Sequence, residues 1–142
     1  MSTLLKCSNQ GENMKLAGIA LIAALALAGC GSMGTSTSKP STPAQAADGT
    51  LIGPNGKTLY FFSKDTKGSG ASACYDTCAK NWPPLDVAST AQPIGDYSII
   101  IRTDGARQWA YQGQPLYYFV KDAKPGDKTG DGVGGNWKVA KP

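Results

Sequence analysis

The chain has 142 residues, with 14 Lys or Arg against 10 Asp or Glu and a formal net charge of +4. This excess is small and scattered, so it predicts no nucleic-acid partner. The sequence has no His, and Glu12 is its only Glu. It therefore excludes Ser-His-Asp triads, c-type haem sites and paired Glu residues of the glycosidase type. We expect a protein that is not an enzyme and carries no cofactor.

The N-terminal residues have the pattern of an export signal. Residues 1–13 show no structural pattern, and we interpret them as an upstream extension, with Met14 as the true start. Residues 14–29 form a lipoprotein signal peptide: a positive charge precedes an apolar run shorter than the roughly 20 residues that a membrane-spanning helix needs. The run ends in Leu-Ala-Gly-Cys, which resembles a bacterial lipobox and predicts cleavage before Cys30 and lipidation of it. The alternative is an ordinary secretory signal with an incidental Cys.

Lipidation of Cys30 would determine where the protein resides. Several acyl chains give stable anchoring, so the membrane is the first predicted partner. The second is an envelope protein or ligand that the sequence does not name. We expect a location in the bacterial cell envelope: the outer membrane, facing the periplasm or the surface, in a Gram-negative organism, and otherwise the outer face of the plasma membrane. Residues 30–47 are rich in Ser, Thr, Gly and Pro and predict a disordered tether. The folded domain is predicted at 48–142.

The domain contains an internal repeat. Residues 56–65 and 113–122 carry Gly, Leu, Tyr, Phe, Lys and Asp at the same offsets, and an Asn-Trp pair follows each copy. Each copy predicts a strand with apolar side chains on both faces and an Asp that fixes the next loop. A repeat of this kind predicts two related halves. The repeat-motif residues are Tyr60, Phe62, Asp65, Tyr117, Phe119 and Asp122, and we expect them to form core pairs and turns. The alternative is that the Tyr and Asp residues of both copies line a shared binding surface.

This Y-x-[FWY]-x-x-D pattern, present twice, resembles that of the bacterial secreted-repeat lipoproteins. The flanking segments 78–85, 108–111, 125–127 and 135–137 support the resemblance, which covers roughly residues 48–142. It implies a secreted or lipid-anchored bacterial protein whose biochemical role is largely unassigned. The chain departs from the pattern after the second Trp, where many members have His and this sequence has Lys138. Imidazole chemistry therefore cannot be carried over to this chain.

The remaining elements predict a mainly β fold. Short strands are expected at 50–52, 97–102, 107–111 and 137–140, and the middle two form a three-strand meander with the second repeat strand. Ser72 is expected to cap a short helical turn that runs to about Lys80. The predicted fold is a small antiparallel β domain of two related halves, with one short helical turn near Cys74 and Cys78.

Cys74 and Cys78 are predicted to form a structural disulfide, because exported proteins meet an oxidising compartment. At helical i and i+4 positions the Cβ atoms lie about 5–6 Å apart, so the turn must distort to close the bond. The alternatives are a redox-active dithiol or a copper site, since the spacing resembles the copper motif of Sco-type chaperones and of the dinuclear site of cytochrome oxidase. Both of those sites also need His.

The last loop carries Asp127 and Asp131 among several Gly residues. It predicts a flexible loop, with a weak calcium site as the alternative. The leading functional prediction is a membrane-anchored cell-envelope lipoprotein acting as a non-enzymatic binding or structural module. The alternative is a thiol-redox, electron-transfer or copper-handling accessory protein that uses Cys74 and Cys78.

Overall fold

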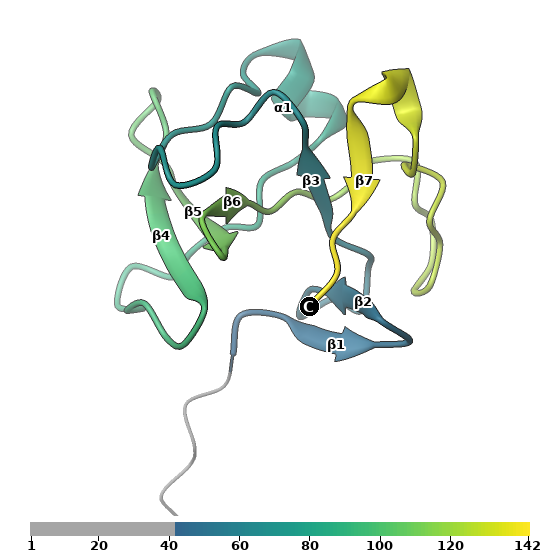
Figure 1. The fold of residues 1–142 in the computed structure, drawn as a ribbon, viewed down its shortest axis with the longest axis horizontal. Coiled ribbons are helices and arrows are strands. Elements are labelled where there is room, and N and C mark those ends of the chain that lie inside the picture. The colour runs from purple at the N-terminus through teal and green to yellow at the C-terminus, as the bar shows by residue number, and fades with distance from the viewer. Residues whose placement is uncertain (1–41) are drawn as a thin grey trace, which may run out of the picture. The chain divides into compact units, whose positions relative to one another are not determined.

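The computed structural model describes residues 42–142. The predicted extension, signal peptide and lipidated Cys30 lie outside the described residues. This part of the chain forms short strands, one α-helix and one 3-10 turn, in the order β1 Gln45–Ala47, β2 Thr50–Ile52, β3 Tyr60–Phe62, α1 Thr77–Asn81, β4 Tyr97–Ile101, β5 Arg107–Tyr111, β6 Gln114–Pro115, η1 Val133–Gly135 and β7 Trp137–Val139. The strands pair antiparallel as β1–β2, β3–β7 and β4–β5–β6 (Figure 1). The predicted mainly β fold is confirmed. No helix among the described residues is both long and apolar enough to cross a membrane.

The folded domain begins earlier than the sequence predicts. The tether was expected to reach residue 47, but β1 spans Gln45–Ala47 and pairs with β2. Asp48 and Gly49 make this possible, because both adopt positive φ (48° and 69°) and so form a two-residue hairpin turn. Ala44, just before β1, is buried in the core. The predicted end of the tether at residue 47 is therefore wrong by a few residues. The residues of β1 have little intrinsic strand preference, and they form a strand because the turn places them beside β2.

The two repeat strands are also shorter than predicted. Within 56–65 only Tyr60–Phe62 is strand, and within 113–122 only Gln114–Pro115 is strand, with Tyr117 in isolated bridges. The reason is that each copy changes partner within a few residues. Its Tyr pairs with the Tyr of the other copy: the Tyr60 N–H donates to the Tyr117 carbonyl at 2.8 Å, and the Tyr117 N–H donates to the Tyr60 carbonyl at 3.1 Å.

A closed ring of three backbone hydrogen bonds organises the first half. The Leu51 N–H donates to the Ala140 carbonyl (2.8 Å), the Ala140 N–H to the Leu59 carbonyl (2.8 Å), and the Leu59 N–H to the Leu51 carbonyl (2.9 Å). Leu51 and Leu59 belong to the first repeat, whereas Ala140 comes from the end of the second. Figure 1 shows the C-terminus beside the β1–β2 hairpin accordingly.

The second half contains the same ring with the roles exchanged. The Trp109 N–H donates to Leu85, the Leu85 N–H to Leu116, and the Leu116 N–H to Trp109, each at 2.9 Å. Here the third member, Leu85, comes from the end of the first repeat. The two repeats thus exchange their C-terminal segments, and each segment completes the other half.

Two hydrophobic clusters fill the interior. One gathers around the rings and includes Leu51, Leu59, Leu85, Trp109 and Leu116. The other lies between the two repeat copies and is mostly aromatic: Tyr60, Phe62, Cys74, Trp82, Tyr117, Phe119 and Trp137. The second cluster contains the repeated Tyr, Phe and Trp of both copies.

Ser72 does not cap the helix, which begins only at Thr77 and follows Asp76 in a positive-φ conformation (49°). The Ser72 hydroxyl is used inside the domain instead. It accepts the Cys74 N–H at 3.1 Å and lies 2.7 Å from the Tyr117 hydroxyl. The predicted helical turn is present, but this competing buried contact places Ser72 outside it.

Candidate functional site

The repeated Tyr and Asp form reciprocal pairs across the two halves. The Tyr60 hydroxyl donates to Asp122 Oδ2 at 2.6 Å, and the Tyr117 hydroxyl donates to Asp65 Oδ2 at 2.7 Å. Both Tyr side chains are fully buried, and Asp65 and Asp122 are 8% and 1% exposed. They are therefore core and turn residues, and the structure contradicts the alternative that they line a binding surface.

The second oxygen of each carboxylate holds the loop that follows it. Asp65 Oδ1 accepts the Ala73 N–H at 2.7 Å, and Asp122 Oδ1 accepts the Thr129 N–H at 3.0 Å. Burial raises the pKa of both Tyr60 and Tyr117, and the hydrogen bond that each donates to a carboxylate raises it further. Each Asp thus fixes its loop, as predicted, and also attaches that loop to the Tyr of the other repeat.

A buried arginine extends one of these pairs. Arg102 is only 3% exposed, and its guanidinium donates to Ser72 Oγ (3.0 Å), Gln108 Oε1 (2.7 Å) and the Cys74 carbonyl. Through Ser72 it connects to the Tyr117–Asp65 pair. Burial raises the pKa of Asp65, and the Arg102 charge opposes that rise. Sequence reasoning missed this residue, because an Arg at the end of a strand has the same pattern as ordinary surface charge.

Four aromatic rings stack in one column through the centre of the second cluster. Phe62 stacks on Trp137 (centroids 4.3 Å apart), Trp137 on Trp82 (3.7 Å) and Trp82 on Phe119 (4.1 Å). The column follows the symmetry of the two repeats: the Phe of each repeat strand stacks on the Trp that closes the other repeat. The Asn-Trp pairs that close the two repeats thus supply its two central rings.

The predicted disulfide between Cys74 and Cys78 is present, with Cα atoms 5.2 Å apart. The expected distortion of a helical turn is not needed, because Cys74 precedes the helix and only Cys78 lies within it. Cys74 is fully buried in the aromatic cluster, and Cys78 is partly exposed. Both sulfurs are occupied in this bond, so a thiolate pair exists only after reduction.

Asp127 and Asp131 accept separate hydrogen bonds, Asp127 from its own loop and Asp131 from strand β7. Asp127 accepts the Ala123 and Lys124 N–H groups at 3.0 and 3.1 Å, and Asp131 Oδ1 accepts the Val139 N–H at 3.0 Å. Within residues 42–142, no group of three or more His, Cys, Asp or Glu side chains is placed to hold a metal ion.

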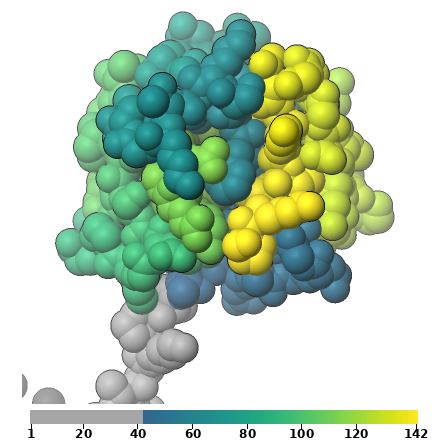
Figure 2. All heavy atoms as spheres, in the orientation of Figure 1, coloured from purple at the N-terminus to yellow at the C-terminus, as the bar shows by residue number. Residues whose placement is uncertain are grey.

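A groove with a volume of about 870 Å³ lies beside β3 and β7. It lies between the C-terminal segment in yellow and the green segment around β6 (Figure 2). Phe61, Phe62 and Trp137 supply aromatic surface, and Trp137 and Phe62 belong to the ring column. The groove therefore opens onto one end of the stacked aromatic core.

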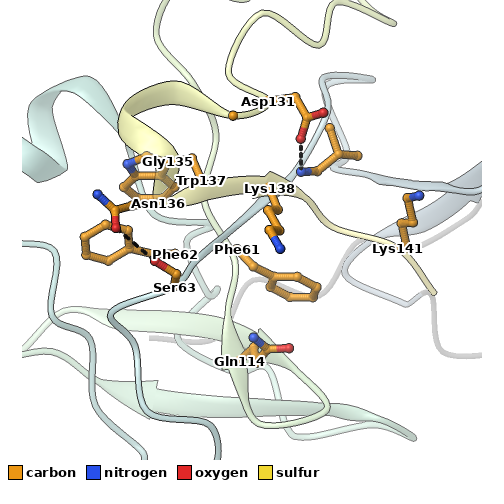
Figure 3. A pocket seen from close by; sticks show the side chains of 12 residues that line it. Phe61, Phe62, Ser63, Gln114, Asp131, Gly135, Asn136, Trp137, Lys138 and Lys141 are labelled. Carbon is orange, nitrogen blue, oxygen red and sulfur yellow. Dashed lines mark hydrogen bonds between the residues drawn. The ribbon is translucent and has the colours of Figure 1, made fainter.

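Polar and charged side chains surround this aromatic surface. Figure 3 shows Phe61 between Lys138 on one side and Gln114 on the other, with Lys141 further along. The Asp131 carboxylate is directed at the backbone of β7. Of the predicted motif residues, Phe62 lines the groove, whereas Tyr60 and Asp65 and their partners in the second repeat do not. Sequence reasoning missed it because its residues come from β3, β6 and the C-terminal segment.

A family described as a secreted repeat of unknown function matches this chain twice, at residues 42–86 and 98–141. Each match begins with a hairpin (β1–β2 or β4–β5) and ends with the exchanged segment, so it covers one structural repeat. No curated protein and no solved structure is significantly similar to the chain. The family description agrees with a location outside the cell or in its envelope. The chain belongs to this secreted-repeat family, with two copies of the repeat forming one domain.

Proposed function

We propose that this protein is a lipid-anchored lipoprotein of the bacterial cell envelope whose domain is a non-enzymatic binding module. Cys30 carries the anchor, and the groove beside β3 and β7 holds the ligand. The observation that carries the proposal is the groove itself, an open site of about 870 Å³ lined by aromatic, amide and cationic side chains. This volume is in the usual range for small-ligand sites, about 300–1,000 Å³.

The scaffold beneath the groove supports a binding role. Phe62 and Trp137 belong to the stacked column, and the β7 backbone is held by β3 and by Asp131. A rigid platform loses little conformational entropy when a ligand binds, which favours affinity. The pairs of titratable side chains, Tyr60–Asp122 and Tyr117–Asp65, are buried away from this surface.

The anchor is tested by changing Cys30 to Ala. The charged, apolar and small-residue zones of residues 14–29 fit cleavage before Cys30, so the variant should lose lipid label and leave the membrane fraction. Fractionation of intact cells with metabolic labelling by a fatty acid measures both. Retention of the label and of the membrane location would contradict the proposed anchor.

The groove is tested by sedimentation of the purified mature protein, in detergent, with the insoluble envelope fraction of the producing cells. Phe61→Ala and Gln114→Ala should each reduce the bound fraction, because both side chains border the groove. Val120→Ala is the matched control, since Val120 is 55% exposed and lies outside it. Thermal melting verifies that each variant is folded. Equal sedimentation of all four proteins would refute the groove as the binding site.

A second candidate function is thiol–disulfide exchange at Cys74 and Cys78. The observation that favours it is their unequal exposure, because an incoming thiolate would attack the partly exposed Cys78 and release the buried Cys74. Reduction would take two electrons from a partner dithiol, which becomes a disulfide. Titrating free thiols of the native protein across glutathione buffers tests this. A disulfide that stays intact at the reducing end excludes the redox role and, with it, a copper-binding thiolate pair.

A further inference from the structure

The two repeats provide an internal comparison for the groove. In the first half Phe61 pairs with Lys138 across β3 and β7. In the second half Tyr118 occupies the place of Phe61, and its N–H donates to the carbonyl of Pro83 at 2.8 Å. Pro83 follows the first Trp as Lys138 follows the second. The backbone arrangement around Phe61 is thus the same as that around Tyr118. Differences between the two places therefore come from their side chains.

The two sides differ in charge and in openness. Pro83 and Asp86 stand where the groove has Lys138 and Lys141. Tyr118 packs so closely on Gly53 that a Cβ there would lie 1.9 Å from its hydroxyl oxygen. Burial, with the nearby charge of Asp86, raises the pKa of Tyr118 to about 12. On the second side Tyr118 therefore lies against Gly53 beside the acidic Asp86, whereas the groove side carries two cations.

The groove cations have no acidic partner in the described domain. The ion pairs found within residues 42–142 are Arg102–Asp104 and Lys124–Asp127, and neither involves Lys138 or Lys141. Asp131, the one carboxylate lining the groove, already accepts the Val139 N–H. Two lysines and one aspartate leave a net charge of +1 on the lining. This charge favours a ligand with an anionic group near Lys138 and Lys141.

The remaining lining fits a sugar ring. Phe61 is partly exposed between the lysine side and Gln114 (Figure 3), so it offers an aromatic face for the C–H groups of a pyranose. The Gln114 amide makes no hydrogen bond within residues 42–142 and faces the groove, where it can both donate to and accept from sugar hydroxyls. We infer that the groove binds a carboxylate-bearing saccharide: its ring lies on Phe61, its carboxylate contacts Lys138 and Lys141, and a hydroxyl contacts Gln114. This inference rests on the proposed binding function and names the ligand class.

The test compares two disaccharides that differ by one lactyl ether group, which carries the carboxylate. N-acetylglucosaminyl-N-acetylmuramic acid has this group, and N,N′-diacetylchitobiose (chitobiose in its acetylated form) lacks it. Isothermal titration of the mature protein in detergent, with Trp fluorescence as a second readout, should show saturable binding of the acidic sugar and about tenfold weaker binding of chitobiose. Lys138→Gln with Lys141→Gln should remove this preference, and Phe61→Ala should weaken both sugars. Lys121→Gln, an exposed lysine outside the groove, is the control and should bind as the unmodified protein does.

Equal affinity for the two sugars, no binding of either, or insensitivity to the lysine changes would each overturn the inference. Vesicles of phosphatidylglycerol form another arm: lysine-dependent vesicle binding without sugar binding would assign the cations to a lipid surface and overturn it as well. If envelope sedimentation still depends on Phe61 while the acidic sugar does not bind, the saccharide inference fails and the proposed binding function stands. If the acidic sugar does not bind and sedimentation does not depend on Phe61, the saccharide inference and the proposed binding function both fail.

Discussion

At the scale of single residues, the repeated Tyr and Asp contribute by joining the two halves. A Tyr followed five residues later by Asp predicted a core position and a turn, and both are confirmed by burial and by the loop contacts of the carboxylates. The sequence could not predict that each Tyr binds the Asp of the other copy, because identical motifs allow pairing within a copy equally well. The buried Arg102 was likewise unpredictable, since its partners lie on separate loops and strands.

The buried tyrosines predict alkaline instability. The folded-state pKa values of Tyr60, Tyr97, Tyr117 and Tyr118 are raised, chiefly by burial, above the unfolded value of about 10. The unfolded state therefore loses these protons first, so their contribution to the free energy of unfolding is complete below pH 10 and is lost as pH rises above it. Denaturant midpoints measured from pH 7 to 12 should fall only in the alkaline range, and tyrosinate absorbance near 295 nm should rise over the same range. A midpoint that stays constant to pH 12 would contradict this.

Removing one hydroxyl tests the Tyr–Asp exchange directly. Tyr60→Phe leaves the Asp122 carboxylate buried without one donor, which should cost about 1–3 kcal/mol in the free energy of unfolding. Tyr117→Phe should behave similarly, because Asp65 loses the equivalent bond. Tyr75→Phe is the control, as the Tyr75 hydroxyl makes no such contact in the described domain. Urea unfolding measures all three, and equal midpoints would show that the exchanged bonds contribute nothing.

At the scale of elements, the predicted strands are present, but the sequence did not predict where all of them end or which strands they pair with. The meander β4–β5–β6 and the final strand β7 followed from alternation and turn residues, and both are confirmed. The hairpin β1–β2 was missed in part, because Gln45–Ala47 has little strand preference and pairs only through the Asp48-Gly49 turn. The repeat strands were predicted too long, because alternation does not reveal where a strand changes partner.

The disulfide beside α1 should stabilise the domain modestly. It closes a loop of very few residues, so it removes little entropy from the unfolded chain, and its loss should cost about 2 kcal/mol or less. Changing both Cys74 and Cys78 to Ser should lower the melting temperature while the aromatic near-UV circular dichroism persists. The loss of that signal at ambient temperature would show instead that the aromatic cluster depends on the bond.

At the scale of the whole molecule, the two repeats are inseparable because each completes the other. Leu85 closes the ring of the second half, and Ala140 closes the ring of the first. The irregular crossover between the repeats is held by Arg107, whose guanidinium donates to the carbonyls of Ala88, Ser89 and Ala91. The sequence revealed two copies but not this exchange, because the rings consist of backbone contacts between residues far apart in the chain. A groove formed at the β3–β7 pairing is one consequence, since neither repeat alone contains both strands.

The exchange predicts that the repeats fold only together. Two separately produced fragments, residues 42–89 and 90–142, would each lack the third member of their ring and half of the stacked column. Each alone should show no cooperative thermal transition, because an unpaired repeat exposes its aromatic face and leaves backbone groups unsatisfied. Mixing them should restore a 1:1 complex with the near-UV circular dichroism of the intact domain, including the contribution of the Trp82–Trp137 stack. Trp137→Ala in the second fragment should weaken this assembly, whereas the exposed Lys121→Gln should not. A first fragment that melts cooperatively as a monomer would mean that the ring and the column are not required for folding, and the two halves would then be independent domains in contact.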